Sequence, residues 1–326
     1  MKLLSIRPLA FLLLAVCAAC ATKPPEPTPA PPAPPPPPPK VALVLGGGGA
    51  RGFAHIGVLK MLAAQGLKPD LIVGTSAGSV AGALYAAGYN AFDLQEMAFA
   101  LDRATIADWS MFGKGLIRGD ALEKFVNKAV RNRPIEALDI PFACVATRLD
   151  TGKAVLFQRG NVGAAVRASS SVPGVFAPAV IDGHEYVDGG LVAPVPIQYA
   201  KQLGADFIIA VDVSTPVNPS VEPSGKLDIL MRTFEIMGQS IRAAELPQAD
   251  IVIQPDLTGI SSSNFESKQQ AILQGERAAL AAMPQIRAKL GERMSPHLPT
   301  TIPFQPGLNP TAGPRTAPST PPPALE

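Results

Sequence analysis

Residues 41–88 read VALVLGGGGARGFAHIGVLKMLAAQGLKPDLIVGTSAGSVAGALYAAG, and this stretch decides the fold. An apolar run, residues 41–45, enters a glycine-rich loop, after which residues 53–65 have a helical pattern. A second apolar run, residues 70–74, leads into a second helical segment, residues 79–87. Strands that are apolar throughout and alternate with helices are typical of a parallel sheet with both faces covered.

The same kinds of segment continue to about residue 293. Further β-like runs cover residues 142–147, 154–157, 184–187, 207–213 and 251–253. Helical patterns cover residues 121–131, 196–203, 227–244 and 266–290. We therefore predict one α/β domain over residues 40–293, with a mostly parallel central sheet flanked by helices on both faces in three layers.

The N-terminal residues have the features of a secretory signal. A short apolar segment, residues 9–16, follows two basic residues and is too short to span a bilayer stably. The small residues after it lead to Cys20, which resembles the lipidation site of a bacterial lipoprotein signal. That signal usually has leucine three places before the cysteine, where this chain has Cys17. Plain secretion with cleavage near the alanines is the alternative. We predict a signal over residues 1–20 with Cys20 lipidated.

Two proline-rich segments flank the predicted domain. Residues 21–39 are mostly proline and alanine, which favours an extended spacer. At about 3.1 Å per residue, residues 23–39 would hold the domain roughly 50 Å from its anchor. Residues 294–326 are rich in proline, threonine and alanine, which is typical of a disordered tail. We predict an exported, membrane-anchored protein of the bacterial envelope. The outer membrane is favoured over the inner because Ala21, rather than aspartate, follows Cys20.

Charge and cysteine content exclude several classes of function. The formal net charge of +2 comes without a long basic run, so nucleic-acid binding has no electrostatic footprint. With Cys17 and Cys20 in the signal, only Cys144 remains, inside an apolar run that predicts a buried side chain. The sequence indicates no metal site and no cofactor.

The glycine-rich loop after the first apolar run is the first candidate site. Unpaired backbone N–H groups at the start of a helix favour negative charge, and glycine lets a ligand oxygen approach closely. Gly47, Gly49 and Gly52 also fit a dinucleotide-binding fingerprint. That fold needs an acidic residue at the carboxyl end of the second strand, whereas Asp70 stands at its start. No Gly-Lys-Ser/Thr follows, which excludes a P-loop. We predict a loop that stabilises an anion.

Two further motifs carry candidate chemistry. Gly74-Thr75-Ser76-Ala77-Gly78 joins an apolar run to a helix of small residues, the context of a G-x-S-x-G nucleophile elbow. A tight strand-to-helix turn with Ser76 as its cap is the alternative. Asp188-Gly189-Gly190 follows a β-like run, and by itself it would be interpreted as a reverse turn.

Taken together, these motifs resemble the patatin-like phospholipase family, which has Gly47-Gly48-Gly49-Ala50-Arg51-Gly52, the Ser76 pentapeptide and Asp188-Gly189-Gly190 in this order. Residues 168–178 also look like the family's block before the aspartate, and the likeness covers roughly residues 40–212. It implies that Ser76 is the nucleophile and that Asp188 accepts its proton directly. The resemblance further implies an oxyanion hole at Gly47, Gly48 and Gly49 and supporting roles for Arg51, Gly52, Gly74, Gly78, Gly189 and Gly190.

The implied activity is that of a serine acyl hydrolase with an acyl-enzyme intermediate and no cofactor. Its substrate would be a lipid ester, cut in the manner of a phospholipase A or lysophospholipase. The alternative is a catalytically inactive binding or scaffold protein of the envelope on the same fold. The sequence does not identify a protein partner.

A Ser-His-Asp triad is the alternative to the dyad. His297 completes the order Ser…Asp…His, but it lies in the proline-rich tail, and His55 and His184 are interpreted as ordinary packed or exposed residues. We expect Arg51 to orient the glycine loop through hydrogen bonds to carbonyl groups rather than to attract a head group. Apolar residues within 98–117 could line an acyl pocket, although core packing is the commoner role.

Overall fold

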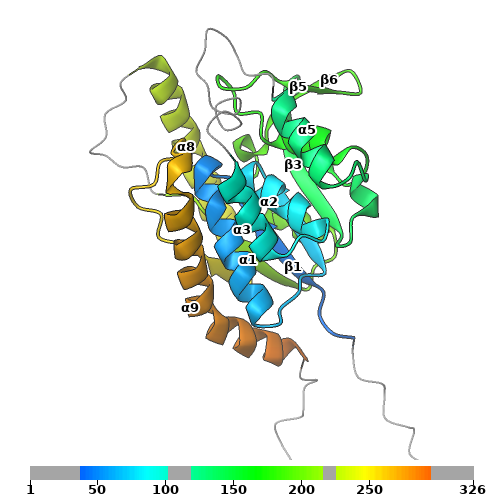
Figure 1. The fold of residues 1–326 in the computed structure, drawn as a ribbon, viewed down its shortest axis with the longest axis vertical. Coiled ribbons are helices and arrows are strands. Elements are labelled where there is room, and N and C mark those ends of the chain that lie inside the picture. Colours follow the sequence, from blue (N-terminus) through cyan, green and yellow to red (C-terminus); the bar gives the residue numbers. More distant parts are fainter. Residues whose placement is uncertain (1–36, 102–118, 216–224, 295–326) are drawn as a thin grey trace, which may run out of the picture. The chain divides into compact units, whose positions relative to one another are not determined.

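The computed structural model describes residues 37–101, 119–215 and 225–294 of the chain (Figure 1). The predicted signal with Cys20, most of the spacer, the tail and His297 lie outside the described residues. Among the described helices, none combines the length and the hydropathy that crossing a membrane requires.

One sheet forms the centre of the described region, and its strands follow the order β5-β6-β3-β2-β1-β7-β8, with β4 also on β3. The strands are β1 (Val41–Leu45), β2 (Leu71–Thr75), β3 (Phe142–Arg148), β4 (Ala154–Phe157), β5 (Ala179–Ile181), β6 (His184–Asp188), β7 (Phe207–Val211) and β8 (Ile251–Ile253). The pairs among β3, β2, β1, β7 and β8 are parallel. The pairs that involve β4, β5 or β6 are antiparallel.

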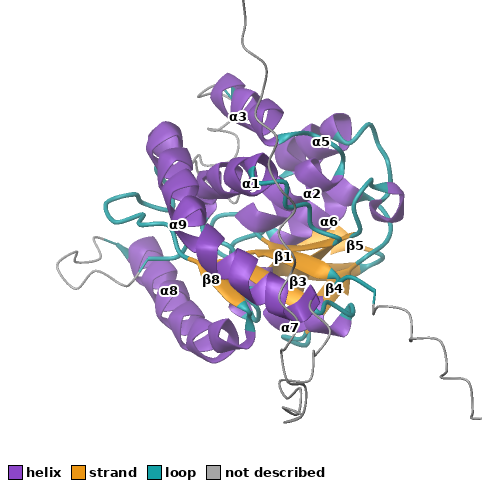
Figure 2. Cartoon of the chain, turned by 90° about the horizontal axis from the view of Figure 1, so that it is seen from below, coloured by secondary structure: helices purple, strands orange, loops and turns teal. Residues whose placement is uncertain are grey.

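Helices cover both faces of this sheet (Figure 2). They are α1 (Ala54–Ala64), α2 (Ala77–Ala86), α3 (Ala91–Ala100), α5 (Asp120–Ala129), α6 (Val162–Ser169), α7 (Ile197–Gln202), α8 (Lys226–Glu245) and α9 (Lys268–Met294). Leu43 and Leu45 of β1 pack in the larger apolar cluster, with α1, α2, α3, α5 and α9. Ala42 and Val44 point to the other face and pack with α7. The predicted three-layer α/β architecture is therefore confirmed.

Every residue of β1, β2 and β7 is buried, which explains why these segments are apolar throughout rather than alternating. Cys144 on β3 is fully buried, as predicted. Burial raises the pKa of its thiol well above the ordinary value, so it remains a small apolar side chain.

The pairing of β3 brings two distant segments together. β2 pairs with β3 up to Thr75 beside Val145, and β6 pairs with β3 from Asp188 beside Ala146. β4 pairs with residues 144–147 of β3, some of which also pair with β2 and others with β6. Since a residue can pair with only one strand on each side, β4 lies along the edge of β3 opposite to both β2 and β6. Consequently β2 and β6 share one edge of β3 and meet end to end there. The residue that follows β2 and the last residue of β6 are placed side by side.

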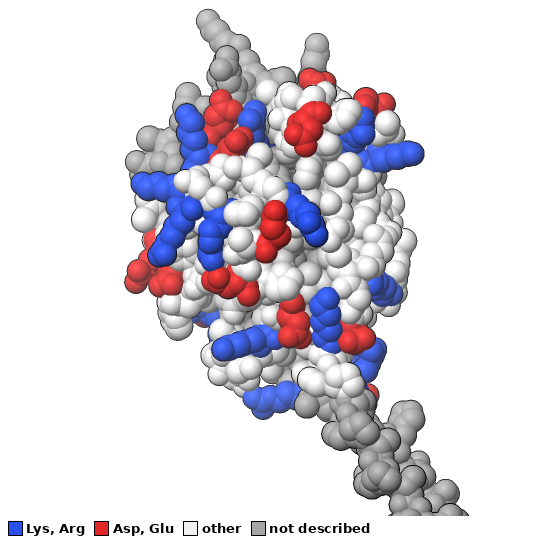
Figure 3. Space-filling view, turned by 90° about the vertical axis from the view of Figure 1, so that its right-hand side faces the viewer, with Lys and Arg blue, Asp and Glu red and all other residues white. Residues whose placement is uncertain are grey.

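Acidic and basic side chains lie interspersed on the face shown in Figure 3. Some neighbouring charges of opposite sign in the described residues form ion pairs, such as Arg133–Asp139 at 2.7 Å and Arg148–Asp150 at 2.9 Å.

Candidate active site

Ser76 forms a one-residue elbow between β2 and α2. Its φ of 52° and ψ of −122° are a backbone conformation that non-glycine residues rarely adopt, at a cost on the order of 1–3 kcal/mol. Hydrogen bonds hold the elbow in place. The Ser76 N–H donates to Ser169 Oγ at 2.9 Å, and the Ser169 hydroxyl donates in turn to the Val145 carbonyl at 2.6 Å. The Ser79 hydroxyl donates to the Ser76 carbonyl at 2.6 Å.

Close packing explains the glycine of the elbow that follows the serine. A Cβ on Gly78 would collide with the Leu45 carbonyl oxygen at the end of β1. The start of α2 therefore lies directly against the neighbouring strand, and only glycine fits at that point.

The elbow directs the Ser76 hydroxyl at Asp188. Ser76 Oγ donates to Asp188 Oδ2 at 2.6 Å, and both residues are buried, with 7% and 3% of their surface exposed. The Gly190 N–H donates to Asp188 Oδ1 at 2.7 Å, so each carboxylate oxygen has a donor. The Thr147 hydroxyl fixes the backbone of the turn by donating to the Asp188 carbonyl at 2.8 Å.

Burial changes the acidity of the Asp188 carboxyl group. Desolvation raises its pKa from 3.8 to about 6, and the hydrogen bonds from Ser76 and Gly190 lower it only in part. Asp188 is therefore mostly ionised at neutral pH, while it is a much better proton acceptor than a solvated aspartate.

The glycine loop is fixed to three neighbouring segments. The Gly46 N–H donates to the Val211 carbonyl at 3.0 Å, the Gly47 N–H to the Pro194 carbonyl at 2.9 Å, and the Ala50 N–H to the Ser262 carbonyl at 2.8 Å.

The prediction that Gly47 supplies an oxyanion donor is wrong in this geometry, because its N–H group is already engaged with Pro194. Within the described residues, the N–H groups of Gly48 and Gly49 have no partner. Gly49 has a φ of 57° and opens a 3₁₀ turn over Gly49–Phe53. The two free donors lie where this turn begins, and Gly49 and Ser76 line the same cavity.

Arg51 does not orient the loop in the way expected from the sequence. Its guanidinium donates to Thr215 Oγ1 and to Glu235 Oε1 of α8, the latter at 2.8 Å, instead of to carbonyl groups of its own loop. The side chain is buried and already paired, so it points away from the cavity rather than toward a ligand.

Neither histidine in the described residues contacts Ser76 or Asp188. His55 is fully buried and its Nε2 lies 2.8 Å from the Gly46 carbonyl, whose oxygen must accept. Desolvation lowers the pKa of His55 to about 4, so the ring is neutral at physiological pH. His184 lies on the exposed part of β6, with its Nδ1 2.8 Å from Arg148 Nη2. As predicted, His55 is an ordinary packed residue and His184 an ordinary exposed one.

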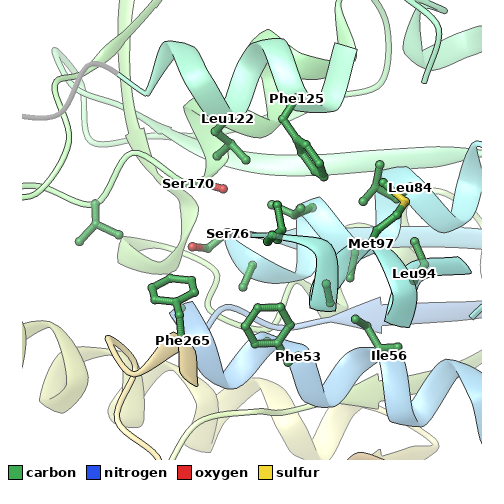
Figure 4. A pocket seen from close by; sticks show the side chains of 18 of the residues that line it. Phe53, Ile56, Ser76, Leu84, Leu94, Met97, Leu122, Phe125, Ser170 and Phe265 are labelled. Carbon is green, nitrogen blue, oxygen red and sulfur yellow. The ribbon is translucent and has the colours of Figure 1, made fainter. Parts of the chain in front are cut away.

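An apolar cavity of about 170 Å³ extends from the elbow (Figure 4). The glycine loop and the elbow contribute Gly49, Gly52, Ser76 and Ala77 to its wall. In Figure 4, Ser76 lies at one end, while Leu84 and Leu94 lie toward the other. Met97, Leu122, Phe125, Phe53, Ile56 and Phe265 complete most of the remaining apolar surface.

Residues 98–117, the apolar segment considered in the sequence as a possible acyl pocket, contribute two residues to the wall of this cavity. Ala98 and Leu101 line the cavity, whereas Phe99 is 49% exposed and points elsewhere. Trp109, Met111, Phe112 and Leu116 lie outside the described residues. The main contributions of α2, α3 and α5 to the wall were not predicted from the sequence.

This arrangement can carry out nucleophilic acyl transfer. A serine hydroxyl donates to a buried carboxylate, two free N–H donors lie on the adjacent loop, and an apolar cavity adjoins both.

Comparisons with known proteins point to one family. Residues 43–201 match the family model for patatin-like phospholipase. An uncharacterized NTE family protein of Mycobacterium tuberculosis is 42% identical over 178 residues, 54% of this chain and 49% of that protein. A second from the same organism is 32% identical over 272 residues, 74% of this chain and 46% of that protein.

A mouse (Mus musculus) relative, patatin-like phospholipase domain-containing protein 6, is 32% identical over 230 residues, 68% of this chain and 16% of the relative. The crystal structure of VipD from Legionella pneumophila has a similar fold, with a TM-score of 0.52 at 14% identity, over 76% of this chain and 67% of VipD. The chain thus spans about half the length, or less, of the curated relatives it matches.

Proposed function

We infer, because residues 43–201 belong to the patatin-like phospholipase family, that the chain is a lipolytic hydrolase that cuts carboxylic esters of lipids. Its nucleophile is Ser76 and its base is Asp188. The observation that carries this proposal is the 2.6 Å hydrogen bond from Ser76 Oγ to the buried Asp188 carboxylate, at the end of an apolar cavity.

Acylation begins when Ser76 Oγ attacks the ester carbonyl carbon and its proton passes to Asp188 Oδ2. The carbonyl oxygen becomes an oxyanion, and the N–H groups of Gly48 and Gly49 donate to it. These groups are held in position before the reaction, which is what makes such donors effective. When the C–O bond of the ester breaks, the leaving alkoxide takes the proton from Asp188 and departs as the alcohol. Ser76 then carries the acyl group.

Deacylation uses the same residues in the opposite direction. Asp188 accepts a proton from a water molecule, whose oxygen attacks the acyl carbon of the Ser76 ester. The second oxyanion is held by the same two N–H groups. Its collapse releases the fatty acid and returns the proton to Ser76 Oγ.

The cavity supports a lipid acyl chain as the group that Ser76 receives. Apart from the hydroxyl groups of Ser76 and Ser170, the side chains that line it are apolar, so an acyl chain can displace water there at little cost. A phospholipid or lysophospholipid is the leading substrate, because the proposed anchor would keep the domain near a bilayer.

Fatty-acid release by the purified full chain tests this function. Phospholipid, lysophospholipid and short aryl ester substrates would be compared, with Ser76→Ala and Asp188→Asn proteins beside the wild type. Release that depends on both residues is the expected result. Release that survives in Ser76→Ala would refute the proposal. A folded protein with no release, and no reaction of Ser76 with a fluorophosphonate, would favour the inactive scaffold.

The N-terminal sequence supports a second proposal, that the enzyme is exported and anchored to the envelope, at the outer membrane, through a lipid on Cys20. Replacing Cys20 with alanine should move the protein from the membrane fraction to the soluble fraction of cells. Unchanged membrane association of Cys20→Ala would exclude this anchor.

A further inference from the structure

The glycine loop is connected to α8 through the side chain of Arg51. Arg51 Nη2 lies 2.8 Å from Glu235 Oε1, and Nη1 donates to Thr215 just beyond β7. The Arg51 side chain is only 6% exposed, whereas that of Glu235 is 38% exposed. The buried guanidinium group of Arg51 therefore pairs with a partly exposed carboxylate on α8.

A second ion pair ties α8 to the strand beside the loop. Arg242 Nε lies 3.7 Å from Asp212 Oδ2, and their side chains are 12% and 4% exposed. Asp212 follows β7, whose Val211 carbonyl accepts the Gly46 N–H at the beginning of the glycine loop. α8 therefore reaches both ends of the loop, directly at Arg51 and through β7 at Gly46.

The two arginines lie close enough to repel each other. Burial lowers the pKa of Arg242, Asp212 raises it, Arg51 lowers it further, and Glu235 raises it. Glu235 thus compensates positive charge on both arginines. The Nε atom of Arg51 is buried and has no partner within the described residues, so this side chain depends on the few contacts that it has.

Charged contacts matter more for α8 than for the other long helices. The buried apolar core of the described residues contains no side chain from α8. Its exposed surface instead contains Ile229, Leu230, Ile236 and Met237, while Glu235, Arg242 and Glu245 lie on the inner side. Apolar burial is the usual way to attach a helix, and here ion pairs take over part of that role.

We propose that Glu235 is a positioning residue for the oxyanion donors. By pairing with Arg51, it holds the glycine loop in the conformation in which the N–H groups of Gly48 and Gly49 are free beside Ser76. This inference rests on the proposed function, because it assigns Glu235 to the same reaction.

The physical argument is the cost of an unpaired buried charge. Without the Glu235 carboxylate, Arg51 would be left beside Arg242 with no ion-pair partner of its own, and its side chain would be driven toward water. The backbone between Gly49 and Gly52 would have to follow. Oxyanion donors act only when they are placed in advance, and a displacement of about 1 Å can reduce a rate about 100-fold.

Steady-state kinetics of the full chain on a soluble aryl ester test the inference. For Glu235→Gln we expect kcat to fall about 10- to 100-fold with KM nearly unchanged, because the donors bind the oxyanion and not the ester. Glu235→Asp keeps the charge and should recover most of the lost kcat. Asp139→Asn is the matched control. It breaks an arginine–carboxylate pair of similar length, 2.7 Å. This pair lies just before β3, at the amino end of that strand and so away from the glycine loop, and its loss should leave kcat unchanged.

A double-mutant cycle decides whether Glu235 acts through Arg51. In an Arg51→Gln background, adding Glu235→Gln should lower kcat no further. An equal loss in both backgrounds, or an unchanged kcat in Glu235→Gln alone, would overturn the inference.

Hydrogen exchange provides a measurement that does not need turnover. A peptide covering residues 46–53 should exchange faster in Glu235→Gln than in the wild type, while the Asp139→Asn protein should not differ. Unchanged exchange would overturn the inference even if the wild type has no esterase activity, a result that would refute only the proposed function. If Glu235→Gln does not fold, Glu235→Asp carries the same test, with smaller changes in kcat and exchange expected.

Discussion

The turns that follow β1 and β2 occupy equivalent places and present different chemical groups. The two strands are parallel neighbours, with Leu45 beside Gly74, and each turn leads into a helix. The first turn runs through several glycines and a 3₁₀ turn before α1, and it leaves backbone N–H groups free. The second consists of Ser76 alone and presents a side-chain oxygen. The carboxyl ends of two neighbouring strands thus supply both the free N–H groups and the proposed nucleophile.

The two turns also differ in how they tolerate a positive φ. Gly49 has a φ of 57° without a Cβ, so its conformation is allowed, and what excludes other residues is the Ser262 carbonyl beside it. Ser76 has a φ of 52° with a full side chain, so it carries the strain itself. The proposed reaction uses the side-chain oxygen of Ser76 at the second turn, whereas at the first turn it uses only backbone N–H groups.

The largest effect is expected at the second turn. Ser76→Ala removes the proposed nucleophile, and Asp188→Asn removes the proposed base, so each should reduce hydrolysis at least about 1000-fold. Fatty-acid release and circular dichroism of both proteins would show this loss with the fold intact. Ser76→Ala should also abolish labelling by a fluorophosphonate. A variant that retained more than one per cent of wild-type activity would contradict the assignment of its residue.

A smaller loss is expected at the first turn. Gly49→Ala should lower kcat about 100-fold, because a Cβ would collide with the Ser262 carbonyl and displace an oxyanion donor while Ser76 stays in place. Gly66→Ala is the matched control. Gly66 also has a positive φ, 74°, but nothing lies near its Cβ position, so this change should cost stability and leave kcat alone. Equal kcat values for the two variants would remove the first turn from the mechanism.

A change deep in the cavity should alter substrate choice without altering either turn. Leu94→Trp would fill the end of the cavity away from Ser76 and should lower kcat/KM for long acyl chains about 10-fold or more relative to short ones. Phe92→Trp, on the exposed side of α3, should leave this ratio unchanged. The ratio is measured with a series of aryl esters of increasing chain length. If neither variant changes it, the acyl chain binds elsewhere.

Effects of pH are expected as well, and the two regions respond with opposite signs. The pKa of Asp188 is raised to about 6, so its contribution to stability is present below pH 3.8 and is lost as the pH rises to about 6. The pKa of His55, beside the first turn, is lowered to about 4, so its contribution is present above pH 6.5 and is lost as the pH falls toward 4.

Asp188→Asn should therefore gain stability relative to the wild type between pH 4 and pH 7, by at most roughly 3 kcal/mol. Denaturation by urea at both pH values measures this change. In the wild type, kcat/KM should rise with pH and level off above about 6, because only the ionised carboxylate accepts the proton. A rate that is still independent of pH at 5 would exclude Asp188 as the base.

The local parts of the site could be predicted from the sequence. The elbow at Ser76 and the turn at Asp188 are short motifs whose flanking strands are apolar throughout, so both their conformation and their strand-end positions follow from neighbouring residues. Parallel strands then place the glycine loop and the elbow at the same sheet edge.

Contacts between distant segments could not be predicted in this way. The N–H group of Gly47 is occupied by Pro194, and Arg51 pairs with Glu235, and neither partner is marked by any local pattern. Helix α6 is only 8 residues long and rich in small residues, so it offers few positions from which a helix could be recognised. Helix α3 begins with a capping box at Asn90 and Asp93, a signal that the sequence does contain and that could have identified it.

The shared edge of β3 has a consequence for the order of events when the protein folds. Ser76 and Asp188 are separated by 112 positions, and they meet only after β6 has added to β3 beyond the end of β2. Contacts of such long range form late, because a large loop must close first. A chain still on the ribosome therefore carries a serine without its base. If the proposed function holds, enzyme activity should return after secondary structure during refolding, once β6 has joined β3.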